Sequence, residues 1–295
     1  MRILITGSSG FIGNNLVKFL SNYDYELFTL DLVDNGHTDF ICDITDNKKI
    51  DDIFREYRFD KVIHLAASAG VRQSLSEPYK YIRNNVIGFQ SILESCVKND
   101  VKQLIYASSS SVYGNLSGCD EKTKCDEQLS VYAVTKKENE NMAYVYSHNY
   151  NLKTTGLRFF SVFGDGIRKD LAIYKFVDNI INDKELEVYG DGTQERDYTP
   201  VRYICEYIKY FIDNEQETDY EIYNIGSQHP ISVNELINTI SEITQIQPKV
   251  VYLQENKQDV KRTYADDSKI RQLYIPKPIT FKEGLGEYIK NKVKN

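Results

Sequence analysis

The stretch TGSSGFIG near the N-terminus constrains the fold of this chain more than any other feature. It follows the short apolar run RILIT and leads into FIGNNLVKFL, whose apolar residues recur with helical spacing. Gly7 permits a tight turn, Gly10 lets the backbone approach a bound group, and Gly13 lets the helix pack on the strand. The free N–H groups that begin the helix attract an anion. The motif therefore predicts a strand–turn–helix unit that binds phosphate.

Asp31 ends the second predicted strand, ELFTLD, eighteen positions after Gly13. A carboxylate at this place accepts hydrogen bonds from the adenosine ribose of a dinucleotide and repels a 2′-phosphate. The glycine loop and Asp31 together predict NAD as the cofactor, in preference to NADP. Asp31 could instead only cap a turn. Asp43 and Ile44 are candidates to flank the adenine.

Strands and helices alternate as far as about residue 160. The predicted strands are RILIT, ELFTLD, KVIHLA, LIYAS and TTGLRF, and helices are expected near 11–20, 46–57, 78–98 and after Ser130. Apolar strands separated by helices are typical of a parallel sheet covered on both faces. We predict an α/β fold, a Rossmann-type doubly wound parallel sheet, with residues 1–160 as the NAD-binding domain.

The alternation loosens after residue 160, where loops rich in Gly and Asp appear (FGDGIRKD and YGDGTQERD). We expect residues 161–295 to form mainly a smaller C-terminal substrate-binding lobe, with roughly 201–228 returning to the Rossmann sheet. Ser232 is followed three residues later by Glu235, which is the pattern of a capping box at a helix start. A cleft between the two parts would hold the substrate.

Charge and cysteine usage exclude several classes. The net charge is −7 and no dense Lys/Arg block is present, which argues against nucleic-acid binding. No apolar stretch is long enough to cross a membrane, and no signal peptide is expected at Met1. The five cysteines are scattered and form no CxxC pair, so we expect reduced thiols, no metal site and a cytoplasmic location. His64 is expected to pack at a strand end.

Tyr132 and Lys136 stand four residues apart in SVYAVTKKENE, so they share one face of the predicted helix. A phenol with an ordinary pKa near 10 becomes a base when a positive charge favours its ionised form. Such a base can take the proton of a sugar alcohol while hydride leaves the same carbon. The pair could equally be two amphipathic residues on an exposed helix, so the spacing by itself leaves both interpretations open.

Further motifs follow in a fixed order: HLAASAGVRQS, YIRNNVIGF, YASSSSVYG, YAVTK, LRFFSVFG, YGDGTQERDYT, YNIGS and YADDSKI. With the glycine loop, they make the chain resemble the extended short-chain dehydrogenases/reductases. Within these it resembles the NAD-dependent nucleotide-sugar epimerase/dehydratase family, and the UDP-glucuronate 4-epimerases most closely. The resemblance covers most of the chain. It implies a homodimer in which the helices near 79–98 and 132–148 pair with their copies.

The resemblance also implies roles for individual residues. Tyr132, Lys136 and Ser109 would form the catalytic set, and Arg196 would hold the diphosphate of a UDP-sugar. The cofactor-binding set is Gly7, Gly10, Phe11, Ile12, Gly13, Asp31, Asp43, Ile44, Leu65, Ala66, Ala67, Asn85, Tyr132 and Lys136. The substrate-binding set is Ser110, Ser111, Ser161, Arg72, Arg168, Arg196 and Asp259.

Two serines separate the branches of the family. Its 4,6-dehydratases carry Asp and Glu at the positions of Ser110 and Ser111, and its decarboxylases carry Glu at that of Ser111. Their absence favours epimerisation: oxidation at sugar carbon 4, rotation of the 4-keto intermediate and hydride return. Ser110, Ser111 and Ser161 could hold a uronate carboxylate. The alternatives are a 4-keto reductase, decarboxylase or dehydratase of surface-polysaccharide synthesis, or an NAD-binding scaffold without activity.

The substrate lobe also departs from the family pattern. Pro200 and Arg202 replace the usual aromatic and acidic residues after the QERD motif, and Gln258 replaces a glycine. FGDG stands in place of the usual YGP. These changes leave the predicted redox residues intact and bear on the identity of the sugar.

Overall fold

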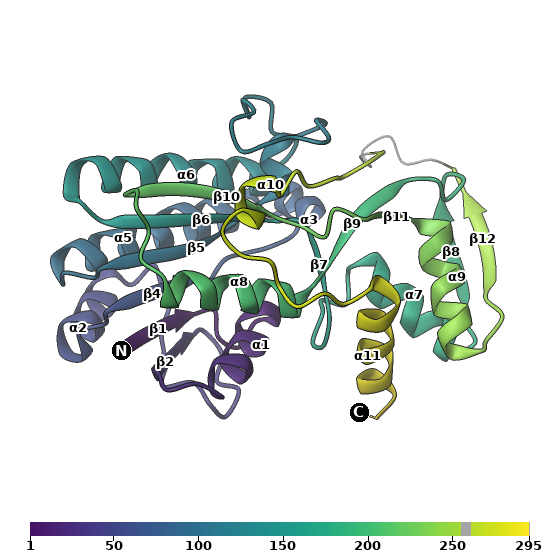
Figure 1. The fold of residues 1–295 in the computed structure, drawn as a ribbon, viewed down its shortest axis with the longest axis horizontal. Helices are drawn as coiled ribbons and strands as arrows, with labels where there is room; N and C mark the ends of the chain where they lie inside the picture. The colour runs from purple at the N-terminus through teal and green to yellow at the C-terminus, as the bar shows by residue number, and fades with distance from the viewer. Residues whose placement is uncertain (255–260, 295) are drawn as a thin grey trace.

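Residues 1–254 and 261–294 are described by a computed structural model. It consists of two joined parts (Figure 1): a parallel sheet with helices on both faces, and a smaller group of helices and short strands beside it. The N-terminal strand lies inside the sheet, and the C-terminal helix belongs to the smaller part.

The large sheet has seven strands among the described residues, in the order β10-β6-β5-β4-β1-β2-β3, and every neighbouring pair is parallel. This order confirms the predicted doubly wound Rossmann-type fold. The strands are β1 (Arg2–Thr6), β2 (Glu26–Asp31), β3 (Phe40–Ile41), β4 (Lys61–His64), β5 (Gln103–Ser109), β6 (Lys153–Phe159) and β10 (Tyr220–Ile225).

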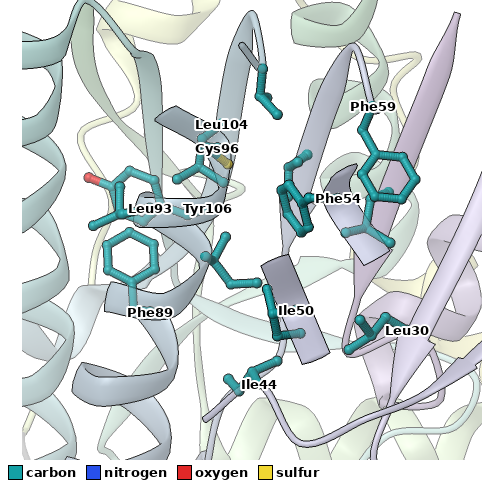
Figure 2. Packing of buried hydrophobic residues seen from close by; sticks show 14 of the residues in the cluster. Leu30, Ile44, Ile50, Phe54, Phe59, Phe89, Leu93, Cys96, Leu104 and Tyr106 are labelled. Carbon is teal, nitrogen blue, oxygen red and sulfur yellow. The ribbon is translucent and has the colours of Figure 1, made fainter. Parts of the chain in front are cut away.

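Helices cover both faces because the central strands bury both sets of alternating side chains. Leu4 and Val62 face a core that contains α2 (Asn47–Tyr57), α5 (Gly88–Lys98) and α6 (Val131–Tyr150). Figure 2 shows part of this core, with side chains from strands and helices meeting in one layer. Ile3 and Ile63 face the opposite core with α1 (Phe11–Leu20), α8 (Val201–Asp213) and α10 (Ser268–Arg271). The pattern explains why the strands read as continuous apolar runs.

The segment predicted as one helix near 78–98 is divided. The structure has α4 (Pro78–Tyr81), a π-helical turn η1 (Ile82–Ile87) and then α5, preceded by the short helix α3 (Val71–Ser76). A π-turn inserts extra backbone into a helix and is frequent at functional sites. Apolar periodicity does not reveal it, because the helix continues on both sides.

The smaller part has its own apolar core, which includes Phe163, Phe176 and Leu236. The capping box at Ser232 and Glu235 is present at the start of α9. Its elements are β7 (Ser161–Phe163), α7 (Ala172–Ile181), β8 (Glu185–Tyr189), β9 (Glu195–Pro200), β11 (Pro230–Ser232), α9 (Val233–Thr244), β12 (Lys249–Leu253) and α11 (Phe281–Lys294).

The chain returns to the large sheet between these elements. After β9, helix α8 packs on the sheet, and β10 pairs in parallel with β6 before the chain enters β11. The two parts are therefore connected by several crossings of the chain, which fixes the smaller part beside the sheet (Figure 1).

None of the helices in the described ranges is long and apolar enough to cross a membrane. All five cysteines are buried and free, as expected for reduced thiols. Within residues 1–254 and 261–294, no group of His, Cys, Asp and Glu side chains is arranged to hold a metal ion.

Gly156→Ala is expected to destabilise the protein by roughly 1–3 kcal/mol, because the new methyl group overpacks the core. A Cβ at Gly156 in β6 would lie 2.6 Å from the phenolic oxygen of the buried Tyr106. Gly286→Ala in α11 is the control, since a Cβ there meets no atom within 4 Å. It should raise stability by roughly 0.5–1 kcal/mol. Denaturant unfolding measures the stability of both variants. Equal changes in stability would contradict the close packing of Gly156 against Tyr106.

Candidate active site

The carboxyl ends of β1, β2, β4 and β5 meet at one edge of the sheet (Figure 1). This edge brings together the glycine loop after Thr6, Asp31, the segment after His64, and Ser109. Ligands bind at this edge of open α/β sheets, because the loops leave a crevice there. The residues predicted from distant parts of the sequence are therefore neighbours.

The glycine loop is packed so closely that two of its positions require glycine. Gly7 has φ of 72°, and a Cβ on it would lie 2.6 Å from the Ala66 backbone nitrogen. A Cβ on Gly13 would lie 2.1 Å from the Gly7 carbonyl oxygen. Helix α1 consequently starts directly against the end of β1.

The start of α1 fits a dinucleotide phosphate. Gly10 is the N-cap and offers no side-chain cap, and the first turn carries no acidic residue. The Ser8 hydroxyl is buried without a hydrogen-bond partner. Unsatisfied N–H groups and a buried hydroxyl are donors for an anion, and the helix dipole has its positive end here. These groups fit the pyrophosphate of NAD.

Asp31 is held beside this loop. One of its carboxylate oxygens accepts the Ser9 N–H at 2.9 Å and the other accepts the Val33 N–H at 3.1 Å. Each oxygen keeps a further lone pair with which it can accept a ribose hydroxyl. The position of Asp31 is thus compatible with the predicted cofactor contact, and a 2′-phosphate here would meet a negative charge.

The remaining cofactor candidates surround the same edge. Asp43 accepts hydrogen bonds from Thr45 and from Arg83, the latter at 2.9 Å. Ile44 is buried in the core against Gly88, and Ala66 borders that core. Other candidates occupy different environments: Ile12 and Leu65 pack toward the α1/α8 core, Phe11 packs toward the smaller part, and Ala67 is half-buried.

Asn85 lies in the π-turn η1 and is almost fully buried. Its side-chain oxygen accepts the Ser68 N–H at 2.7 Å, and its amide nitrogen donates to the Ser68 carbonyl and the Thr135 hydroxyl, both at 3.0 Å. Asn85 therefore holds the segment after β4 against helix α6, because its side-chain amide is hydrogen-bonded to Ser68 and to Thr135.

Tyr132 sits in the first turn of α6, which Ser130 caps through a hydrogen bond from the Ala133 N–H at 3.1 Å. The Ser109 side chain at the end of β5 lies close enough to the Tyr132 phenol to lower its pKa. The Lys136 ammonium lies 6.0 Å from the centre of the Tyr132 ring and donates to the Ala107 carbonyl at 2.9 Å. The structure thus brings the three predicted catalytic residues together.

Burial governs the proton affinities of this set. It raises the pKa of the Tyr132 phenol, while the Ser109 hydrogen bond and the positive charge of Arg168 act in the opposite direction. Burial lowers the pKa of Lys136 to about 8. The sequence indicated Lys136 as the charge that favours the phenolate; in the structure the positive charge that lowers the Tyr132 pKa is that of Arg168.

Arg168 reaches the site from the loop after β7. Its guanidinium binds the Asp170 carboxylate through two hydrogen bonds and lies against Gly70 and Tyr81, and the Tyr81 ring makes an edge contact with Tyr132. A cation from the smaller part therefore stands beside the Tyr132 phenol.

The other substrate candidates are more dispersed. Ser110 and Ser111 form the start of the 3-10 turn η2 (Ser110–Tyr113), and Ser161 begins β7; all three are half-buried. Arg72 is exposed on α3. Arg196 lies in β9, where its guanidinium donates to the Glu195 carbonyl at 2.8 Å. Asp259 and Gln258 lie outside the described residues.

Arg202, one of the departures from the family pattern, has a packing explanation. It pairs with Glu206 one turn later on α8, at 2.8 Å. Glu206 also accepts the Lys277 N–H at 3.0 Å and the Tyr274 hydroxyl at 3.2 Å. Arg202 therefore helps to hold the C-terminal segment on α8.

Sequence reasoning missed several residues that shape the site: Ser8, Ser108, Glu140 and Arg158. Glu140 lies one helical turn after Lys136 on the same face, a spacing that was readable in the sequence. Arg158 stands inside the apolar strand TTGLRF, and a charge in a buried strand requires a partner. The identity of that partner was not readable.

Comparisons with known proteins agree with this geometry. A model of the NAD dependent epimerase/dehydratase family matches residues 3–226. The UDP-glucuronate 4-epimerase of Thermodesulfobacterium geofontis is 36% identical to this chain. The match covers 96% of this chain and 93% of that protein. The UDP-glucose 4-epimerase of Thermotoga maritima with UDP-glucose superposes with a TM-score of 0.93 at 28% identity, covering 100% of this chain and 99% of that one. The UDP-glucuronic acid 4-epimerase from Bacillus cereus with UDP-glucuronic acid and NAD superposes with a TM-score of 0.90 at 29% identity. That superposition covers 99% of this chain and 100% of that one.

Lys136→Met is expected to raise the free energy of unfolding near neutral pH. Burial lowers the Lys136 pKa from 10.5 to about 8, so folding opposes its charged form. The cost is roughly 3 kcal/mol. It is fully present below about pH 8 and vanishes as the pH rises toward about 10.5, where the unfolded chain also loses the proton. Urea unfolding near pH 7 and near pH 10 measures it. A gain in the free energy of unfolding that persists unchanged near pH 10 would contradict burial of the Lys136 charge as its cause.

Proposed function

The chain belongs to the NAD dependent epimerase/dehydratase family, with NAD as its cofactor, and we propose that it is a UDP-sugar 4-epimerase that interconverts UDP-glucuronate and UDP-galacturonate. The observation that carries this proposal is the hydroxyl set at the end of β5. Ser109 meets Tyr132, and the next two positions are serines, where dehydration would require an acid and a base.

Each catalytic side chain has one task. NAD, when bound, would supply the hydride acceptor for sugar carbon 4 and the hydride donor for the opposite face of the rotated 4-keto sugar. Tyr132 takes the proton of the 4-hydroxyl group and later gives it back. Ser109 donates a hydrogen bond to the sugar oxygen as it becomes a ketone. The Lys136 ammonium and the Arg168 guanidinium favour the phenolate form of Tyr132.

The cofactor is held by groups already placed at the sheet edge. The start of α1 and the Ser8 hydroxyl bind the pyrophosphate, and Asp31 accepts the adenosine ribose hydroxyls. Because the hydride is returned in each turnover, NAD stays bound and acts catalytically. No net oxidation or reduction of the sugar results.

The uronate carboxylate is bound by hydroxyl groups in this proposal, chiefly Ser110 and Ser161. Ser111 donates its hydroxyl proton to Ser109 at 2.8 Å, so this proton is already engaged and is not assigned to the carboxylate. Hydroxyl donors keep the carboxylate ionised without a neighbouring carboxylic acid to promote loss of CO₂. Arg196 holds the diphosphate.

Incubation with UDP-glucuronate and no added reductant tests the proposal. The expected product is UDP-galacturonate, with no CO₂ released and no accumulation of reduced cofactor. Conversion of UDP-glucose to UDP-galactose instead would assign a neutral sugar. Inertness toward all UDP-hexoses, with reduced cofactor consumed only by a 4-keto sugar, would assign the reductase branch and refute epimerisation.

Tyr132→Phe is expected to lower turnover by about 10²–10⁴-fold, because the base is lost while the ring remains. NAD binding, measured by the cofactor that co-purifies with the protein, should be retained. Tyr81→Phe is the matched control, because Tyr81 packs beside Tyr132 and donates to the Ala69 carbonyl at 3.0 Å. Full activity of Tyr132→Phe would refute the mechanism.

We also propose that the enzyme is a cytoplasmic homodimer. The buried thiols fit a reducing compartment. Apolar side chains are exposed on three neighbouring elements: Tyr79, at 86%, on α4, Ile87 on η1, and Val134 and Val145 on α6. Exposed apolar side chains gathered on neighbouring helices are typical of a protein interface. Pairing with a second copy would form a four-helix contact.

Val134→Asp is expected to convert the dimer to a monomer, because a carboxylate in the centre of the helix contact would be buried without a partner. Light scattering after size-exclusion chromatography measures the mass. Val293→Asp on α11 introduces the same charge at another exposed valine and should leave the mass unchanged. A dimer that survives Val134→Asp would place the interface elsewhere.

A further inference from the structure

Helix α6 presents three side chains in one line toward the end of β5, and each engages a different strand residue. Tyr132 meets the Ser109 side chain, Lys136 binds the Ala107 carbonyl at 2.9 Å, and Glu140 accepts the Ser108 hydroxyl at 2.7 Å. The spacing of four residues keeps them on one helical face. The last three residues of β5 are therefore each fixed to α6.

Glu140 is the anchor of this arrangement. Its carboxylate is fully buried and forms a two-pronged ion pair with Arg158 of β6, with Nε and Nη2 at 2.7 and 2.8 Å. Burial alone raises the pKa of the Glu140 carboxyl, but the hydrogen bonds and charge of Arg158 and the Ser108 hydroxyl outweigh it, so the pKa lies below its ordinary value. Glu140 is thus a charged acceptor.

Arg158 extends the anchor to the turn after β5. Its Nη1 donates to the Tyr113 hydroxyl at 2.7 Å, and that hydroxyl lies 2.7 Å from the Asn224 side-chain oxygen in β10. The buried network thus joins α6, β5, β6, β10 and η2. A two-pronged pair fixes direction as well as distance, so α6 cannot slide or rotate on the sheet without exposing an unpaired buried charge.

We propose that Glu140 and Ser108 are positioning residues of the active site, which hold the Tyr132 phenol and the Ser109 hydroxyl within hydrogen-bonding distance of each other. Neither touches the reacting atoms. This inference rests on the proposed function for its kinetic consequences only, because the surroundings of the Tyr132 phenol can be observed without any substrate.

Ser108→Ala is the decisive variant, because it removes one hydroxyl and leaves the Glu140–Arg158 ion pair intact. The ¹³Cζ resonance of Tyr132 in tyrosine-labelled protein, assigned with Tyr132→Phe, reports its hydrogen bond. The resonance is expected to move in Ser108→Ala and to return in Ser108→Thr, which restores the hydroxyl. Ser95→Ala is the control, since the Ser95 hydroxyl is buried without a partner on α5.

The kinetic arm uses the UDP-sugar that the turnover assay identifies. Ser108→Ala is expected to lower kcat by about tenfold with KM unchanged, because misplacement of reacting groups acts on the chemical step. It should have little effect in a Ser109→Ala background, since Ser108 acts through Ser109. The same loss of kcat in the wild-type and Ser109→Ala backgrounds would overturn the proposal.

The pH profile supplies a readout that a purely structural role would not move. The groups that face Tyr132 are Ser109 on β5, Lys136 on α6, Tyr81 on α4 and Arg168 from the smaller part. Only the Ser109 contact changes in Ser108→Ala. Because that contact lowers the Tyr132 pKa, the acidic limb of the kcat profile should move to higher pH.

Glu140→Gln tests the anchor itself by the same measurements. Should it fail to fold, Ser108→Ala decides the question alone. Should no UDP-sugar be turned over, the proposed function fails and the Tyr132 resonance still decides the positioning role. A Tyr132 resonance and a pH profile of Ser108→Ala that match those of Ser95→Ala would refute the positioning role.

Discussion

The buried ion pair between Glu140 and Arg158 fixes helix α6 on the parallel sheet. Both charges are removed from water, so the pair is stable only because Arg158 binds two-pronged and Ser108 satisfies the carboxylate further. The positions of Tyr132 and Lys136 on α6 depend on this contact. It sets where the helix starts relative to the carboxyl edge of the sheet. That edge already carries the glycine loop and Asp31, so cofactor site and catalytic base share one frame.

The smaller part is joined to this frame by a second buried carboxylate. Asp197 of β9 accepts the N–H groups of Ser227, Gln228 and Ala265, at 2.8, 3.1 and 3.1 Å. Ser227 and Gln228 lie just beyond the sheet strand β10, after Gly226, so β9 is tied to the end of the sheet. Since β7 pairs with β9 in parallel, the loop that brings Arg168 to Tyr132 is held as well. The catalytic phenol is thus influenced by charges from both parts of the chain.

The proposed catalytic role and stability conflict at Lys136. Its ammonium is buried near Tyr132, and burial opposes the charged form and lowers its pKa to about 8. The protein compensates partly through the Ala107 carbonyl. The family resemblance assigned the redox residues readily, since they are shared by every branch. The sugar depends on residues that differ between branches, and in our proposal the two serines of η2 and the loop of Arg168 carry that information.

The order of strands and helices, the glycine loop, Asp31 and the Tyr132–Lys136 pair could be predicted from the sequence, because each follows from local spacing. Apolar periodicity, a required glycine and a four-residue helical step are properties of short segments. Tertiary structure alone decided the π-turn at Ile82–Ile87, the pairing of Glu140 with Arg158, the donation of Ser111 to Ser109 and the approach of Arg168 to Tyr132. A buried charge must find its partner in space, and which elements pack together determines the choice.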